Sequence, residues 1–185
     1  VPSVMLGWSG SRGMTVEQIK DQLKTAAASD GAQPLASAYF ELNDDVRRWA
    51  AKAKADKKIR LFGFSTHANM AELMTGAARL DWIDGIMLTY NYRNMASPEM
   101  TAAVEACVKA GIGLTAMKTQ GGGQVLTNNP EELKLAGRFV QSGFTEGQAR
   151  LKAVWENPQI ASICSQMPSM ALLSQNTAAA VNKTR

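Results

Sequence analysis

Residues 57–66 read KKIRLFGFST and contain the segment that decides the fold. The stretch from Ile59 to Ser65 is short, apolar and partly aromatic, which is typical of a buried strand. Comparable apolar runs follow at residues 83–90, 112–117 and 160–164. Helix signals separate these runs, so strands and helices alternate. This alternation predicts a parallel sheet with right-handed crossovers, in either an open doubly wound sheet or a barrel.

Capping residues mark the starts of the intervening helices. Ser97-Pro98-Glu99 supplies an N-cap, a proline at the first helical position and an acid at the positive end of the dipole. We expect that helix to run to Ala110 and stop at Gly111. Other helices are predicted over residues 70–80, from Asn129, from the capping box of Thr145 and Gln148, and over residues 168–181.

The first part of the chain has a less regular pattern. Residues 4–6 are a candidate strand, and residues 36–40 are a second one. Thr15 and Gln18 form a capping box for a helix that would reach about residue 28. Asn43 begins another predicted helix, which ends near residue 55 in a run of lysines that we expect to be solvated.

Composition limits the possible classes of function. The chain has 185 residues, 45% of them hydrophobic, which is enough to build the core of one domain. A net charge of +4 is too small to indicate a nucleic-acid-binding protein. The chain has two cysteines and one histidine, a composition that argues against zinc, iron–sulfur and histidine-rich metal centres. We expect Cys107 and Cys164 to be buried thiols. The sequence shows no membrane span or signal peptide, and we expect a cytoplasmic protein.

Four segments in order carry a resemblance to a known family. They are the strand 57–66, Tyr90-Asn91 after the strand that follows Asp84, GIGLTAMK at 111–118 with its glycine loop, and Gln175-Asn176 in the last helix. This order resembles the second half of the aldo-keto reductases, which are nicotinamide-dependent (β/α)8 barrels. The resemblance covers about residues 57–180. It implies an α/β fold of the TIM-barrel type, with residues 1–185 forming one partial domain that lacks the first strands.

The resemblance also implies a site for NAD(P)H at the C-terminal ends of the strands, where barrel enzymes place their chemistry. Ser65 and Thr66 would hold the nicotinamide carboxamide, and Met117 would pack against the nicotinamide ring. The glycine loop would contact the pyrophosphate through its small residues and a lysine, and the last helix would face the adenosine end. The implied cofactor-binding residues are Ser65, Thr66, Met117, Lys118, Gly121, Gly122, Gln166, Gln175 and Asn176.

Several positions depart from the pattern of the family. Thr66 replaces an asparagine and Met87 replaces a glutamine, so two carboxamide contacts are lost. Gln166 and Leu172 stand where members that prefer the 2′-phosphorylated cofactor have basic residues, so the sequence does not favour NADP over NAD. Taken without the family, Ser65-Thr66 is also a simple strand end, and Gly121-Gly122-Gly123 is also a plain connector.

The catalytic Asp, Tyr, Lys and His of the family have no counterpart in this sequence. The segment 35–41, where the His is expected, has none, and the segment 4–9 lacks the expected Lys. We therefore predict no catalytic residues and interpret the chain as an incomplete or degenerate member. The function that the resemblance implies is that of an aldo-keto reductase type of enzyme, which transfers hydride from NAD(P)H to a small carbonyl substrate. The alternatives are a non-catalytic nucleotide-binding or interaction module and a plain scaffold. No nucleic-acid or membrane partner is expected.

Overall fold

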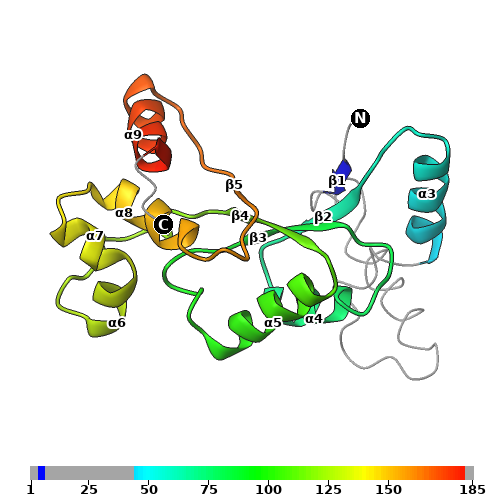
Figure 1. The fold of residues 1–185 in the computed structure, drawn as a ribbon, viewed down its shortest axis with the longest axis horizontal. Coiled ribbons are helices and arrows are strands. Elements are labelled where there is room, and N and C mark those ends of the chain that lie inside the picture. Colours follow the sequence, from blue (N-terminus) through cyan, green and yellow to red (C-terminus); the bar gives the residue numbers. More distant parts are fainter. Residues whose placement is uncertain (1–3, 7–43, 182–185) are drawn as a thin grey trace, which may run out of the picture.

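The structure is a computed structural model that describes residues 4–6 and 44–181 (Figure 1). Within these ranges the chain forms a five-stranded sheet in which every adjacent pair of strands is parallel. The strands are β1 (Val4–Leu6), β2 (Phe62–Thr66), β3 (Gly85–Thr89), β4 (Gly113–Met117) and β5 (Ser162–Ile163). The predicted helix from Thr15, the predicted strand 36–40 and the segment 35–41 lie outside the described residues.

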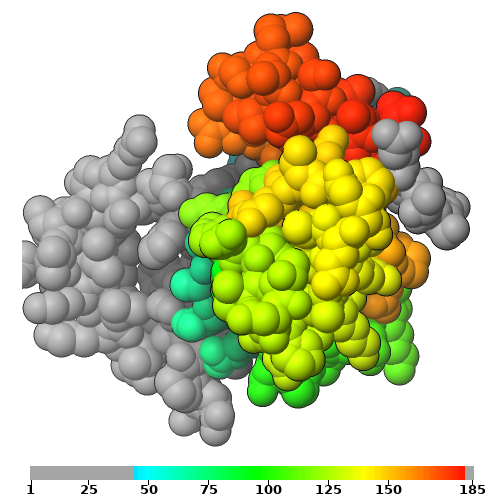
Figure 2. Space-filling view, turned by 90° about the vertical axis from the view of Figure 1, so that its left-hand side faces the viewer, coloured from blue at the N-terminus to red at the C-terminus, as the bar shows by residue number. Residues whose placement is uncertain are grey.

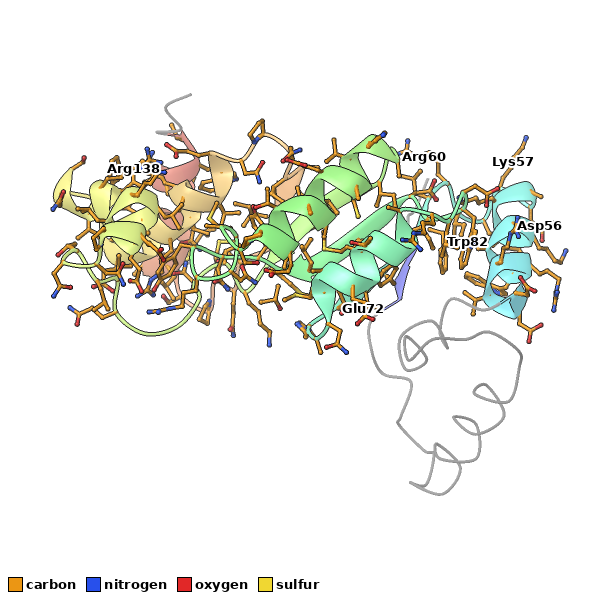
Figure 3. The ribbon with its side chains drawn as sticks, turned by 90° about the horizontal axis from the view of Figure 1, so that it is seen from below. Asp56, Lys57, Arg60, Glu72, Trp82 and Arg138 are labelled. Atoms are coloured by element: carbon orange, nitrogen blue, oxygen red, sulfur yellow. The ribbon has the colours of Figure 1, made fainter. Side chains whose placement is uncertain are left out.

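The order of the strands identifies the type of sheet. They lie side by side in chain order, β1-β2-β3-β4-β5, without the reversal that defines a doubly wound sheet. Helices α4 (Met70–Ala77) and α5 (Pro98–Lys109) pack against one another on the same side of the sheet (Figures 1 and 3). A singly wound parallel sheet with its crossover helices on one side is the architecture of a (β/α)8 barrel. The described residues form part of such a barrel.

Side-chain alternation separates the two faces of the sheet. Ile86, Leu88 and Leu114 face the helices and have no measurable exposure, and they belong to the main core together with Phe62, Phe64, Ala116 and residues of α4 and α5. The opposite face carries Gly63, Ser65, Met87 and Thr115, most of which are only partly buried. We call this opposite face the inner face, because it is the side that turns toward the axis of a barrel.

The remaining helices extend from the sheet in chain order. Helix α3 (Asp44–Ala55) precedes β2, and α6 (Pro130–Glu132), the π-helix η2 (Leu133–Gly137), α7 (Arg138–Gln141) and α8 (Glu146–Trp155) lie between β4 and β5. Helix α9 (Met170–Val181) follows β5 and packs against α8 (Figure 2). At the opposite end of the molecule, the Trp82 ring packs against the Phe62 ring of β2, with 5.5 Å between the ring centroids, on the side of the sheet near α3 (Figure 3).

The capping signals fold as predicted. The Ser97 hydroxyl accepts a hydrogen bond from the Met100 N–H, and Pro98 begins α5. The Asn129 side chain accepts from two N–H groups of α6, and Thr145 and Gln148 form the expected capping box of α8. Gly111 has φ +78°, as a helix-terminating glycine requires.

Two expectations are corrected by the structure. Cys107 is buried as predicted, but Cys164 is exposed, because it follows the two-residue strand β5, whose one neighbour among the described strands is β4.

In the lysine run of α3, Lys54 is not simply solvated. Its Nζ lies 2.5 Å from an Asp84 carboxylate oxygen, which also accepts from the Phe62 N–H at 2.7 Å. Asp84 therefore ties α3 to the start of β2.

Candidate cofactor site

The site residues predicted on the strands share one edge of the sheet. Ser65 pairs in register with Met87, and Thr89 pairs with Met117, so the C-terminal ends of β2, β3 and β4 lie next to each other. Adjacent strands are about 4.8 Å apart, and Met117 lies two residues beyond Thr115, the residue in register with Ser65 through Met87, so Ser65 and Met117 are roughly 12 Å apart. This edge is where barrel proteins gather their functional loops.

Ser65 and Thr66 point to opposite faces of β2. Ser65 shares the inner face with Met87 and is partly exposed. Thr66 is buried in the row that contains Leu88, and its hydroxyl donates a hydrogen bond of 2.8 Å to the Ala68 carbonyl. Within this pair, the accessible polar side chain on the inner face is therefore that of Ser65.

Met117 ends β4, and Lys118 begins the loop that follows it. Met117 is partly buried on the inner face, whereas Lys118 is exposed and forms no ion pair within the described part of the chain. The backbone of Lys118 has φ +52°, a left-handed conformation that non-glycine residues rarely adopt. The Asn91 side-chain amide holds it there by donating to the Lys118 carbonyl at 3.2 Å.

We call residues 118–124 the glycine loop. Its three glycines have φ of +65°, +67° and +66°, left-handed values that favour glycine. A Cβ on Gly121 would lie 3.0 Å from the Tyr92 ring, so the loop packs closely against the segment after β3. A Cβ on Gly122 would meet nothing within 4 Å, so the backbone at Gly122 borders open space. A ligand can approach the main chain at that point.

Two arginines bind the carbonyl groups of this loop. Arg93 donates from Nε to the Gly122 carbonyl at 3.3 Å and from Nη2 to the Gln124 carbonyl at 3.2 Å. Arg150, on α8, donates to the Gly123 carbonyl. Each arginine also has an acidic partner, because Arg93 pairs with Glu132 at 3.1 Å and Arg150 pairs with Glu146 at 2.7 Å.

The residues predicted for the adenosine end lie around α9. Gln166 and Gln175 have exposed side chains, and the Gln175 carbonyl accepts from the Gln148 side chain at 3.2 Å. Asn176 is buried and donates to the Ser165 hydroxyl at 3.4 Å, so it fixes the segment that leads into α9. A shallow hollow on α9, lined by residues such as Met170 and Leu173, includes none of the predicted residues.

Groups that could move protons are sparse in the described ranges. His67 follows β2 and its Nδ1 lies 3.0 Å from the Thr89 hydroxyl. Tyr90 is buried on the helix side, and burial raises the pKa of its hydroxyl, while a hydrogen bond from Asn157 at 2.7 Å lowers it. Tyr92 is also buried, with its hydroxyl 3.4 Å from the Gly122 carbonyl. Neither tyrosine presents an accessible phenol on the inner face.

Two buried polar groups at the glycine loop have no hydrogen-bond partner among the described residues. The Thr119 hydroxyl and the Arg150 Nε–H are the buried side-chain polar groups without a partner in the described part of the chain. Both belong to the loop or to a residue that binds it. An unsatisfied buried polar group costs about 1–3 kcal/mol, and an ordered water, an ion or a functional role usually accounts for such a group in a native structure.

Sequence reasoning missed Arg93, Arg150 and Thr119. Arg93 stands two residues after the Tyr90-Asn91 motif, but the carbonyls that it binds are about 30 residues further along the chain. A basic residue four positions after the end of β3 was the local signal available for Arg93. In the described ranges, no group of three or more His, Cys, Asp or Glu could hold a metal ion. No described helix is both long enough and apolar enough to cross a membrane.

Comparisons with known proteins agree with this architecture. The chain matches no protein-family model, and no curated protein is detectably similar to it. Among solved structures it is similar to an aldo-keto reductase of Bacillus halodurans in its holo form, with 14% identity, a TM-score of 0.59, and coverage of 97% of this chain and 55% of that one. An aldo-keto reductase of Klebsiella pneumoniae in complex with NADPH gives 18% identity, a TM-score of 0.54, and coverage of 84% and 51%.

A thermostable aldo-keto reductase in complex with the inhibitor epalrestat gives 19% identity and a TM-score of 0.54, and the match covers 73% of this chain and 48% of that chain. The chain therefore spans about half the length of the structures that it matches. These matches show that the described part has the fold of the aldo-keto reductases as a partial barrel, which confirms the expected fold class.

Proposed function

We propose that this chain is the dinucleotide-binding half of an aldo-keto reductase type of oxidoreductase, and that it binds NAD(P)H along the C-terminal edge of its sheet. The observation that carries the proposal is the glycine loop, whose backbone is exposed at Gly122 next to Lys118, an exposed cation with no ion pair among the described residues. Exposed main-chain N–H groups beside a lysine form a favourable site for phosphate.

The proposed cofactor lies across the strand ends. Its nicotinamide is nearest Ser65 and Met117, its pyrophosphate nearest Lys118, Gly121 and Gly122, and its adenosine toward Gln166, Gln175 and Asn176. Ser65 offers a short hydroxyl to the carboxamide, and Met117 offers a polarisable surface to the ring. Thr66 contributes through the turn at Ala68, since its hydroxyl is already used there.

When bound, the cofactor supplies hydride to a small carbonyl substrate. The residues of this chain orient the nicotinamide and hold the phosphates, but the reaction also needs a proton donor at the carbonyl oxygen. Tyr90 and Tyr92 are buried, and the one histidine of the sequence, His67, lies at the end of β2. We therefore propose that the chain alone binds the cofactor without substantial turnover.

Calorimetric titration with NADPH and NADH tests the binding. We expect measurable affinity for both and little preference for NADPH, because Gln166 and Leu172 carry no charge. Lys118→Ala should weaken binding severalfold, whereas Lys109→Ala, which removes an exposed lysine from α5, should not. Absence of binding, or equal effects of the two substitutions, would contradict the proposed site.

A second assay addresses turnover. General acid–base catalysis is commonly worth 10²- to 10⁴-fold, so we expect little oxidation of NADPH in the presence of simple aldehydes or ketones. His67→Ala should then change nothing. Clear turnover that disappears in His67→Ala would show that the chemistry lies at the end of β2 and that the chain is a complete catalyst.

A further inference from the structure

We propose that Arg93 and Arg150 are positioning residues that hold the glycine loop in its anion-binding conformation by binding its carbonyl oxygens. This inference rests on the proposed function and names residues that neither the sequence motifs nor the family resemblance indicated. Its basis is the contacts of three successive carbonyls, those of Gly122, Gly123 and Gln124, with guanidinium groups.

Peptide geometry links these contacts to the opposite side of the loop. In a planar trans peptide the C=O and the following N–H point in opposite directions, and the described chain has no cis peptide bonds. When the Gly122 carbonyl turns toward Arg93, the Gly123 N–H turns away from it. In the same way, the contact of the Gly123 carbonyl with Arg150 turns the Gln124 N–H outward. Within the described residues these N–H groups have no acceptor, and they lie on an exposed part of the loop.

The charges show that the arginines act through the loop and not directly on the ligand. Arg93 is paired with Glu132, whose second oxygen accepts from the Leu126 N–H at 2.7 Å, so this glutamate also fixes the end of the loop. Arg150 is paired with Glu146 and its side chain is only 13% exposed. Both cations are therefore compensated, and Lys118 remains the uncompensated charge of the loop within the described residues.

Each arginine uses the planar fork of its guanidinium. Arg93 reaches two carbonyls and one carboxylate at once, which a lysine ammonium cannot do with the same geometry. We call the contacts of Arg93 and Arg150 with the loop carbonyls the clamp. Substitution by lysine therefore keeps the charge and removes the clamp. This difference separates positioning of the loop from simple electrostatic attraction of an anion.

Titration with ADP and with NADP⁺ tests the clamp. We expect Arg93→Lys and Arg150→Lys each to weaken both ligands about tenfold, although the net charge is unchanged. Glu132→Gln should also weaken them, although it makes the site more positive. The matched controls are Arg138→Lys and Glu156→Gln, which alter an ion pair between α7 and the end of α8 and should have no effect. Unchanged affinity in the lysine variants, or tighter binding by Glu132→Gln, would overturn the clamp.

A measurement on the protein without ligand separates this inference from the proposed function. Amide ¹⁵N relaxation should report order parameters near 0.85 for Gly121 to Gly123 in the unaltered chain and below about 0.6 in Arg93→Lys. If no nucleotide binds the unaltered chain, the proposed function fails, and the relaxation data still decide the clamp. Equal order parameters in the two proteins would overturn it.

Discussion

Lys118 has both an unfavourable backbone conformation and an exposed charged side chain. Its backbone is left-handed, which costs an ordinary residue roughly 1–2 kcal/mol, and its carbonyl is held by Asn91 and by the Gly121 N–H at 3.1 Å. Its side chain is exposed beside the loop that we assign to phosphate. Unfavourable backbone conformations of this kind concentrate at functional sites, where the surrounding contacts maintain them.

Substitution of Lys118 separates its backbone from its charge. Lys118→Gly should be more stable than Lys118→Ala by roughly 0.5–1 kcal/mol. Glycine adopts the left-handed backbone without the strain that alanine has there, and its larger loss of conformational entropy on folding offsets only part of this advantage. Both variants remove the amine and should lose nucleotide affinity to a similar degree. Urea denaturation measures the stability difference. An alanine variant at least as stable as the glycine variant would show that this position is not held at positive φ in solution.

The buried thiol of Cys107 makes the folding stability of the protein depend on pH in the alkaline range. Burial raises the pKa of its thiol from 9.0 to about 11. The folded state therefore retains a proton that the unfolded state releases, so this contribution to stability is full below about pH 9 and is lost as the pH rises toward 11. We expect the thermal midpoint of the unaltered chain to fall more steeply over this window than that of Cys107→Ala. Cys164→Ser, at the exposed cysteine, should retain the steep fall, and parallel profiles for all three would contradict the assignment.

At the scale of elements, helix starts position the loops that form the site. Helix α5 begins directly after the segment that carries Asn91 and Arg93, and α8 begins four residues before Arg150. The cap of each helix fixes where the preceding loop ends. The Ser97 cap therefore affects both the stability of α5 and the path of the segment that contacts the glycine loop.

Ser97→Ala should destabilise the protein by about 1 kcal/mol, because the Met100 N–H loses its acceptor. Ser97→Asp keeps an acceptor and adds a negative charge at the positive end of the helix dipole, so it should be neutral or slightly stabilising. Chemical denaturation monitored by circular dichroism measures both. Equal destabilisation by the two substitutions would indicate that the hydroxyl is required for a reason other than capping.

At the scale of the whole molecule, the described sheet has two edges and an incompletely covered inner face. Strands β1 and β5 each have a single neighbour in the described sheet, and Ser65, Met87 and Thr115 on the inner face are only partly buried. A closed barrel removes such edges, whereas unpaired edges favour association with other chains. The same edge explains the exposure of Cys164 after β5.

We therefore expect the 185-residue chain to associate as its concentration rises. Size-exclusion chromatography with light scattering under reducing conditions measures this. Cys164→Lys places a charge at the end of the β5 edge and should weaken association severalfold, while Cys164→Ser removes the thiol without adding a charge and should not. A compact monomer at every concentration, with scattering that fits a closed eight-stranded barrel, would contradict the open sheet.

The sequence by itself determined most of the elements between residues 44 and 181, but not the π-helix η2 that interrupts the helix predicted from Asn129. Apolar runs and capping residues are local patterns, so strands such as Phe62–Thr66 and the cap at Ser97 were predictable within a few residues. Their order along the chain, joined to the motifs of 57–66 and 111–118, also indicated the family of folds. The strand-end positions of Ser65, Met117 and Lys118 followed from those motifs.

Only the tertiary structure decided the winding of the sheet, the face to which each side chain turns and the support of the glycine loop. Alternating strands and helices are compatible with two sheet architectures, and the unreversed strand order selects the barrel type. The opposite faces of Ser65 and Thr66 depend on register with β3. The contacts of Arg93 and Arg150 with the glycine loop join residues 27 to 31 positions apart, and no local pattern encodes them, because they exist only once adjacent strand ends have been brought together.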